Sequence, residues 1–440
     1  MRGIALLGIL IGNVMWFSGF AVADAQARAA FTMPAVDAVV ETLVHIVVDG
    51  KFYSLFSLLL GAGFALGLRH GTPASFARRL AVLFVFGSAH ATLLWFGDIL
   101  SLYAVTGVVL LVVVDTSPRR LALAGVACLG APIVLGGGWL AADELWGVVS
   151  GRGHGPASML GAFASGSYAD VFDANWAFLL DRWYLVVLSS RLLRILGMFL
   201  LGVAAIRADV LHRPEVLVRL ATALWPFALV ANVAVGLLGG DAPPRPPTLL
   251  GWLTDVLACV GGPTGAVVYA VAIVLGPRRR RIDACLGAAG RMSLTNYVGQ
   301  SAVMAGLFYG YGLGGWGRLG ASAAVLVAIV IFAAQVLISR AWLGRFDQGP
   351  LEWLWRLARS GLTRNRSPRR PRSRSPAPSA EPRARGEAHT ARDRPRRRGD
   401  TPKARGATAR RARGEPRDAC RGSAGSSSCR SRWSGGATTR

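Results

Sequence analysis

The chain has 440 residues, of which 52% are hydrophobic and 17% charged, a composition too apolar for a soluble protein of this length. The formal net charge of +25 would be typical of a nucleic-acid-binding protein if it were spread over the whole chain. It is concentrated instead in residues 361–440, which hold 23 Lys and Arg against 6 Asp and Glu. We therefore expect a lipid bilayer, and not nucleic acid, as the main partner.

Ten apolar runs are long enough, at about 17–25 residues, to cross a bilayer as helices. They are residues 3–22, 52–68, 80–97, 99–114, 121–141, 184–206, 216–239, 253–276, 284–309 and 319–339. The predicted fold class is an all-α, polytopic membrane helix bundle of about ten transmembrane helices over residues 1–358. The first run, followed by AVADAQA, also fits a secretory signal peptide, but Asn13 inside the run argues against that reading.

Basic residues fall on every second loop between these runs, which sets the orientation of a membrane protein. The basic loops contain Arg69 with Arg78 and Arg79, then Arg119 and Arg120, then Arg207 with Arg213 and Arg219, then Arg278 to Arg281. With ten helices this alternation places both termini in the cytoplasm. We expect a protein of the bacterial cytoplasmic (inner) membrane.

Residues 142–183 form the longest predicted loop, on the outer side. Helical spacing within it predicts a short amphipathic helix that lies either in the membrane interface or as a lid on the bundle. Its apolar positions, with one amide among them, are Tyr168, Val171, Phe172, Asn175, Trp176, Leu179 and Leu180.

The last 80 residues, 361–440, are rich in Arg, Pro, Ser and Gly and have almost no aliphatic residues. Such a segment cannot bury a core, so we predict that it is disordered. A basic tail on the cytoplasmic side could attract anionic lipids, or it could be an out-of-frame extension without an evolved role. We favour the second interpretation.

Two ionisable residues lie in the apolar stretch GSAHATLLWFGDILSLYAVTG, residues 87–107: His90 and Asp98. Ionisable groups at this depth are costly unless they are paired or line a wet cavity, and they often mark a site. Eight residues along a straight helix correspond to ~12 Å, so we expect them to flank one cavity without touching.

Further polar residues lie at a similar depth. Arg191 and Arg194 share one helix face, and Lys51 and Asn13 lie in or beside the first two runs. Two buried cations require a carboxylate, a phosphate or water, so the arginines are candidates to bind an anionic substrate, with Lys51 and Asn13 beside them.

The ninth run carries a polar stripe of Ser293, Asn296 and Gln300. Asn296 and Gln300 are candidate substrate contacts, but such side chains also join membrane helices by hydrogen bonds, and this is the reading we favour for the stripe. Gly63 and Gly67 in GAGFALG match the small-xxx-small pattern of helix packing and not a nucleotide-binding loop. The five cysteines have no metal-ligand spacing, and no metal site is predicted.

Six stretches resemble the YeiB-like family of bacterial membrane proteins, domain of unknown function 418. In family order they are RGIALLGILIGN (2–13), DGKFYSLFSLLLGAGFALGLR (49–69), GSAHATLLWFGDILSLYAVTG (87–107), RLLRILGMFLLG (191–202), GRMSLTNYVGQS (290–301) and GPLEWLWR (349–356). The resemblance implies an N-terminal motif region over about 1–140 and a C-terminal family domain over about 184–358. The family motif Leu-Asp-x-x-Arg-Gly lacks its Asp here, because Met1 directly precedes Arg2.

This family is distantly similar to transmembrane acyltransferases, including the heparan glucosaminide acetyltransferase group. The similarity implies His90 as base or acyl-accepting nucleophile, Asp98 as the group that orients it, and Arg191 and Arg194 as contacts for an anionic substrate. It also implies an acyl-CoA-type donor and an extracytoplasmic acyl acceptor. The residues themselves equally fit a transporter for a small anionic metabolite or a non-catalytic scaffold, and they set no oligomeric state.

Overall fold

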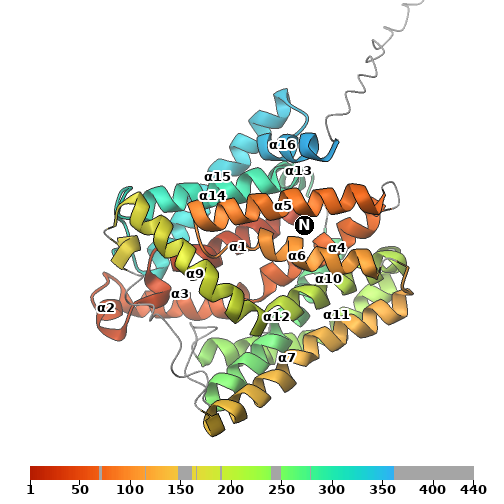
Figure 1. Ribbon diagram of the computed structural model, residues 1–440, viewed down its shortest axis with the longest axis horizontal. Helices are drawn as coiled ribbons and strands as arrows, with labels where there is room; N and C mark the ends of the chain where they lie inside the picture. Colours follow the sequence, from red (N-terminus) through yellow and green to blue (C-terminus); the bar gives the residue numbers. More distant parts are fainter. Residues whose placement is uncertain are drawn as a thin grey trace, which may run out of the picture. The chain divides into compact units, whose positions relative to one another are not determined.

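The computed structural model describes residues 1–68, 72–113, 115–146, 161–164, 166–188, 191–238, 249–277 and 279–360. Within these residues every regular element is a helix (Figure 1), which confirms the all-α fold class. The predicted disordered tail, residues 361–440, lies outside the described residues.

Each of the ten expected runs coincides with helical structure. The helices are α1 (Arg2–Phe17), α4 (Lys51–Leu68), α5 (Pro73–Leu93), α6 (Leu100–Val112), α7 (Pro118–Trp146), α10 (Arg191–Arg207), α11 (Pro214–Leu237), α12 (Leu249–Leu275), α13 (Arg280–Arg291) with α14 (Ser293–Phe308), and α15 (Ala321–Arg345). Five segments of the described chain are long and apolar enough to cross a membrane by length and composition: 34–68, 118–135, 214–237, 249–275 and 321–343. The membrane character is supported, but the count of ten crossings is not confirmed.

Several helices differ from the sequence expectation. The ninth run is broken at Met292 into α13 and α14, and helices α3 (Pro34–Val47) and α16 (Pro350–Ser360) lie outside the ten runs. Helix α9 (Tyr168–Leu188) begins where an amphipathic helix was expected but continues past residue 184, where the sixth run begins. The short helix α2 (Ala25–Ala29) precedes α3.

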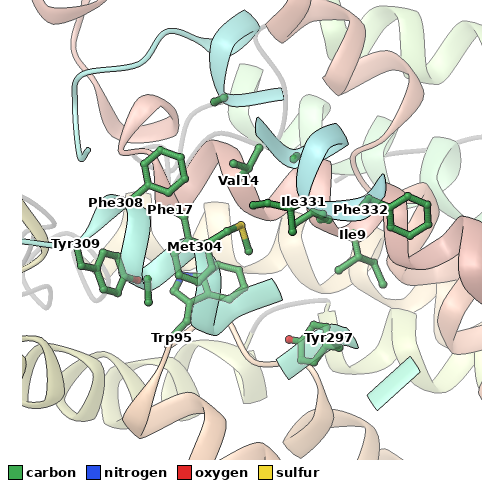
Figure 2. Close-up of a cluster of buried hydrophobic side chains, with 14 of the residues drawn as sticks. Ile9, Val14, Phe17, Trp95, Tyr297, Met304, Phe308, Tyr309, Ile331 and Phe332 are labelled. Atoms are coloured by element: carbon green, nitrogen blue, oxygen red, sulfur yellow. The ribbon is translucent and has the colours of Figure 1, made fainter. Parts of the chain in front are cut away.

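Helix α1 packs against α4, α13, α14 and α15. A large apolar cluster surrounds it, in which Phe17 of α1 lies beside Trp95 and Met304 (Figure 2). Because this cluster draws residues from α1, α14, α15 and the segment after α5, it fixes the end of α5 against α14. This arrangement positions the candidate site described below.

Glycines allow the close contact between α4 and α10. A Cβ at Gly61 would lie 2.1 Å from the carbonyl oxygen of Phe199, and one at Gly202 would lie 2.1 Å from that of Leu58. Gly63 and Gly67, which were expected to pack against a helix, have arginine guanidinium groups as the nearest atoms to such an added Cβ. Neighbouring helices α1 and α5 thus meet these two glycines through arginine side chains and not through a close backbone contact.

Two carboxylates cap the N-termini of the antiparallel helices α14 and α15, one at each helix. Glu352 of α16 accepts hydrogen bonds from the backbone N–H of Leu294 (2.7 Å) and from Thr295. Asp37 of α3 accepts hydrogen bonds from the N–H and hydroxyl of Ser322 at the start of α15. Negative charge at a helix N-terminus satisfies free N–H groups and is favoured by the helix dipole, so α16 and α3 hold α14 and α15 in place.

Candidate active site

His90 links a hydroxyl and a carboxylate that lie far apart in the sequence. Its Nε2 lies 2.8 Å from Oγ of Ser301 in α14, and its Nδ1 lies 3.2 Å from Oδ1 of Asp98. The three residues are almost completely buried, with exposures of 3% for His90 and 0% for both Asp98 and Ser301. They form an Asp98–His90–Ser301 array, which we call the triad.

The contact between His90 and Asp98 corrects the expectation that the two would not touch. That expectation assumed one straight helix, whereas α5 ends at Leu93 and the chain turns before α6 begins at Leu100. The turn brings Asp98 back alongside the last turn of α5. Gly87 permits this approach, because a Cβ there would lie 2.3 Å from the backbone nitrogen of Ser101 and 2.9 Å from Oδ2 of Asp98.

Asp98 is held in one orientation by the start of α6. Its Oδ1 accepts a hydrogen bond from the N–H of Leu100 (3.1 Å), and its Oδ2 accepts from the N–H (2.7 Å) and hydroxyl (2.6 Å) of Ser101. Backbone donors at a helix N-terminus stabilise a carboxylate. The buried Asp98 is therefore compensated as an anion and can orient the imidazole of His90.

Ser301 lies in the middle of α14, eight residues after its first residue, or ~12 Å along the axis. Its Oγ is also 3.4 Å from the carbonyl oxygen of Tyr297 one turn earlier. The ring of Tyr297 lies 5.0 Å from that of His90, centroid to centroid. The imidazole therefore has the ring of Tyr297 at its face, a hydrogen bond to Ser301 at Nε2 and the carboxylate of Asp98 within ion-pair distance of Nδ1.

A hydroxyl, an imidazole and a carboxylate in this order can perform nucleophilic acyl transfer. The imidazole accepts the hydroxyl proton as the oxygen attacks, and the carboxylate fixes the tautomer and stabilises the resulting imidazolium. The distance of 2.8 Å between Ser301 and His90 lies within the range of about 2.6–3.2 Å expected for a nucleophile and its base. No group of three or more His, Cys, Asp and Glu side chains among the described residues could hold a metal ion.

Helix α9 covers the turn that carries Asp98. The side chain of Asn175, fully buried, accepts a hydrogen bond from the N–H of Phe96 (3.1 Å) and donates one to the carbonyl of Thr92 (3.3 Å). The hydroxyl of Tyr168 donates to the carbonyl of Leu93. This supports the lid interpretation of the amphipathic segment, although Trp176 on the same helix is 49% exposed and leaves an apolar outer face.

Aromatic side chains fill the space next to this turn. Phe17 contacts Trp95 (4.8 Å between ring centroids) and Tyr309 (5.5 Å), and Phe163 contacts Tyr309 (5.0 Å) and Trp316 (5.5 Å). Figure 2 shows Trp95 and Tyr309 on the same side of the cluster. The turn between α5 and α6 is therefore covered by packed rings and by α9.

The predicted polar stripe on α14 joins α14 to α15. Gln300 donates a hydrogen bond to the side chain of Gln335 (2.8 Å), which in turn donates to the carbonyl of Asn296. The amide of Asn296 donates to Ser339 (3.0 Å). These bonds fit the structural role that the sequence analysis favoured, and a substrate contact for Asn296 or Gln300 stays a prediction.

The remaining predicted site residues lie elsewhere in the bundle. Lys51 is buried at the start of α4, where its ammonium donates to the carbonyls of His45 and Asp49 (2.7 Å each). Asn13 is half-buried on α1.

Arg191 and Arg194 lie on the first turn of α10, exposed and half-buried respectively. Helix α10 packs against α6, the helix whose start Asp98 caps. That the arginines meet the triad stays a prediction.

Sequence reasoning did not single out Ser301. Serine is common in membrane helices, where its hydroxyl bonds the carbonyl four residues earlier, so the residue type alone indicates nothing. Its position directly after Gln300 in the motif GRMSLTNYVGQS is the only signal that we find in the sequence, and its partner His90 lies 211 residues away.

Known proteins match most of this chain. The family described as "Protein of unknown function (DUF418)" matches residues 205–361. Uncharacterized protein YxaH of Bacillus subtilis is 30% identical over 389 residues, covering 81% of this chain and 92% of its own length. Uncharacterized protein YeiB of Escherichia coli is 29% identical over 383 residues, covering 81% and 94%. No solved structure matches.

Proposed function

The chain belongs to the YeiB-like family of proteins of unknown function, DUF418, and we propose that this member is a membrane acyltransferase. It would sit in the cytoplasmic membrane with both termini inside and pass an acyl group from a thioester donor to an acceptor on the outer side. The observation that supports this proposal is the hydrogen bond of 2.8 Å between Ser301 and His90, with Asp98 3.2 Å behind the imidazole.

In the first half of the reaction, Oγ of Ser301 attacks the carbonyl carbon of the acyl thioester. Nε2 of His90 accepts the hydroxyl proton, and Asp98 stabilises the imidazolium through Nδ1. When the C–S bond breaks, the proton passes from His90 to the departing sulfur. The acyl group is then joined to Ser301 as an ester, and the thiol leaves.

In the second half, a hydroxyl or amine of the acceptor attacks the ester carbonyl. His90 takes the proton of the acceptor and returns it to Oγ of Ser301 as the C–O bond to the serine breaks. The triad thus ends in its starting state, and the net change is transfer of the acyl group from sulfur to the acceptor.

A fluorophosphonate probe tests the nucleophile without knowledge of the substrate, because it needs only an activated serine. Oγ of Ser301 would displace fluoride and form a Ser–O–P bond, while His90 takes the proton. We expect the full-length protein in lipid nanodiscs to be labelled on the peptide that contains Ser301, and we expect Ser301→Ala to lose the label.

The control is Ser54→Ala, since Ser54 is another fully buried helix serine whose hydroxyl bonds a backbone carbonyl. That variant should label like the wild type. The corresponding experiment with radiolabelled acetyl-CoA should leave an alkali-labile acyl ester in the wild type and none in Ser301→Ala. Label that persists in a folded Ser301→Ala protein would refute the assignment of Ser301 as nucleophile.

A further inference from the structure

Two arginines from different helices lie against one face of α4. A Cβ added at Gly63 would be 3.0 Å from Nη2 of Arg2, and one added at Gly67 would be 3.3 Å from Nη1 of Arg79. Positions four residues apart on a helix share a face and lie about 5–6 Å apart. The guanidinium groups of Arg2 (α1) and Arg79 (α5) therefore lie against adjacent turns of the same face of α4, over glycines that leave room for them.

The positions of both arginines are set by neighbouring helices. The ring of Trp355 in α16 lies 5.3 Å from the guanidinium carbon of Arg79, and its Nε1 donates a hydrogen bond to the carbonyl of the same residue. Arg2 is positioned by the close contact of α1 with α13, where a Cβ at Gly290 would lie 2.9 Å from the nitrogen of Gly3. The neighbouring helices therefore fix the backbone positions of both residues, while the side chain of Arg79 is half-buried and that of Arg2 is exposed.

The helix beside Arg2 carries more basic than acidic side chains, with Asp283 as its one carboxylate. Helix α13, which packs on α1, carries exposed Arg280, Arg281 and Arg291. The carboxylate of Glu352, on the same helix as Trp355, is engaged with the start of α14. This end of the bundle is also the one that the loop charges assign to the cytoplasm.

We propose that Arg2 and Arg79 form a binding site for a phosphate or diphosphate group at the cytoplasmic end of α4. Guanidinium groups bind phosphate oxygens with paired, charge-assisted hydrogen bonds, and two of them over adjacent turns of one helix face can share one diphosphate. The identification of that group with the phosphates of a coenzyme A-type donor rests on the proposed function. A phospholipid headgroup offers the same chemistry.

Helix α16 connects this site with the triad. It contacts Arg79 through Trp355 and the first turn of α14 through Glu352, and Ser301 lies ~12 Å further along α14. A donor anchored by its phosphates at Arg2 and Arg79 would have to extend its thioester arm along α14 to reach Ser301. Glu352 and Trp355 both belong to the family motif GPLEWLWR. This arrangement therefore gives a role to a motif that contributes no residue to the triad.

The test uses the full chain in phosphatidylcholine nanodiscs at 0.15 M salt and measures binding of coenzyme A and of pyrophosphate by calorimetry. We expect Arg2→Gln and Arg79→Gln each to weaken binding at least tenfold. Gly63→Ala keeps the charge but places a methyl group against Arg2, and it should weaken binding as well. The controls Arg219→Gln, an exposed arginine of α11, and Gly130→Ala, where a Cβ meets no atom within 4 Å, should bind like the wild type.

Because the basic tail is present in every variant, its background binding is the same throughout. A second arm replaces part of the lipid with phosphatidylglycerol and counts retained lipid by native mass spectrometry. Loss of retained phosphatidylglycerol in the arginine variants, with no binding of coenzyme A to the wild type, would identify the headgroup as the source of the phosphate. The double variant Arg2→Gln/Arg79→Gln decides the outcome. If the folded wild type and this variant bind coenzyme A, pyrophosphate and phosphatidylglycerol equally well, or if neither binds any of the three, the proposed site is overturned.

The outcome is separable from that of the proposed function. Ser301→Ala should bind coenzyme A normally while losing the acyl ester, whereas Arg79→Gln should keep fluorophosphonate labelling of Ser301 while losing phosphate binding. If the wild type binds coenzyme A at Arg2 and Arg79 but the fluorophosphonate never labels Ser301, the catalytic role of the triad is refuted and the phosphate site is not.

Discussion

Replacing Gly87 with alanine tests whether the turn after α5 places Asp98 for chemistry. The added Cβ would lie 2.3 Å from the nitrogen of Ser101 and 2.9 Å from Oδ2 of Asp98, whereas ordinary contact begins at 3.4 Å. The obstructing atom at 2.3 Å is the backbone nitrogen of Ser101, so the turn must move away from α5 by about 1 Å. We expect the free energy of unfolding to fall by about 1–3 kcal/mol, as for other overpacked sites. A displacement of about 1 Å in a catalytic group can cost roughly 10²-fold in rate.

The assay compares the rate of fluorophosphonate labelling at Ser301 with thermal unfolding of the same protein. Gly107→Ala is the matched control, because it overpacks the same pair of helices at a Cβ distance of 2.6 Å from Leu80 but does not touch Asp98. It should lower stability and keep the labelling rate. A folded Gly87→Ala protein that labels as fast as the wild type would show that the position of Asp98 does not matter for the reactivity of Ser301.

Three further substitutions and one truncation follow from the same contacts. His90→Ala should abolish labelling of Ser301 while Asp98 keeps its bonds to Leu100 and Ser101; labelling that persists in the folded variant would contradict the role of His90 as the base. Asp98→Asn should keep the fold and slow labelling by at least 10²-fold, since the tautomer of His90 is no longer fixed. Glu352→Gln should lower the free energy of unfolding by about 0.5–2 kcal/mol through loss of a charged helix cap, measured by thermal denaturation. Deleting residues 365–440 should leave insertion and thermal stability unchanged, and a truncated chain that does not accumulate would contradict this.

The parts of the fold and site that could be predicted from sequence are those with a large energetic signature. Apolar runs marked the helices because lipid or a buried core requires them, and His90 and Asp98 stood out because an ionisable group in such a run is costly. Helices α3 and α16 were missed because they are too short or too polar to resemble a span. Their caps, Asp37 and Glu352, act on helices that lie far away in the sequence.

The contacts within the triad depend on details that residue spacing does not carry. The eight residues between His90 and Asp98 suggested ~12 Å, but the helix ends at Leu93 and the turn reduces the distance between Nδ1 and Oδ1 to 3.2 Å. Apart from its place in the motif GRMSLTNYVGQS, nothing in the local sequence distinguishes Ser301 from other helix serines. Its role depends on α14 lying against α5, which is a property of the packed bundle and is fixed by the aromatic cluster and the two acidic caps.

The burial of the triad bears on the kind of acyl chemistry that it supports. An acyl ester on Ser301 would be hydrolysed if water reached it as easily as the acceptor does, and a site that excludes water suppresses this side reaction. Ser301 and Asp98 have no exposure, and packed rings together with α9 cover the turn beside them. An enclosed nucleophile of this kind fits transfer to a bound acceptor better than hydrolysis. The hydrogen bonds of Asn175 to Phe96 and Thr92 hold α9 over this turn.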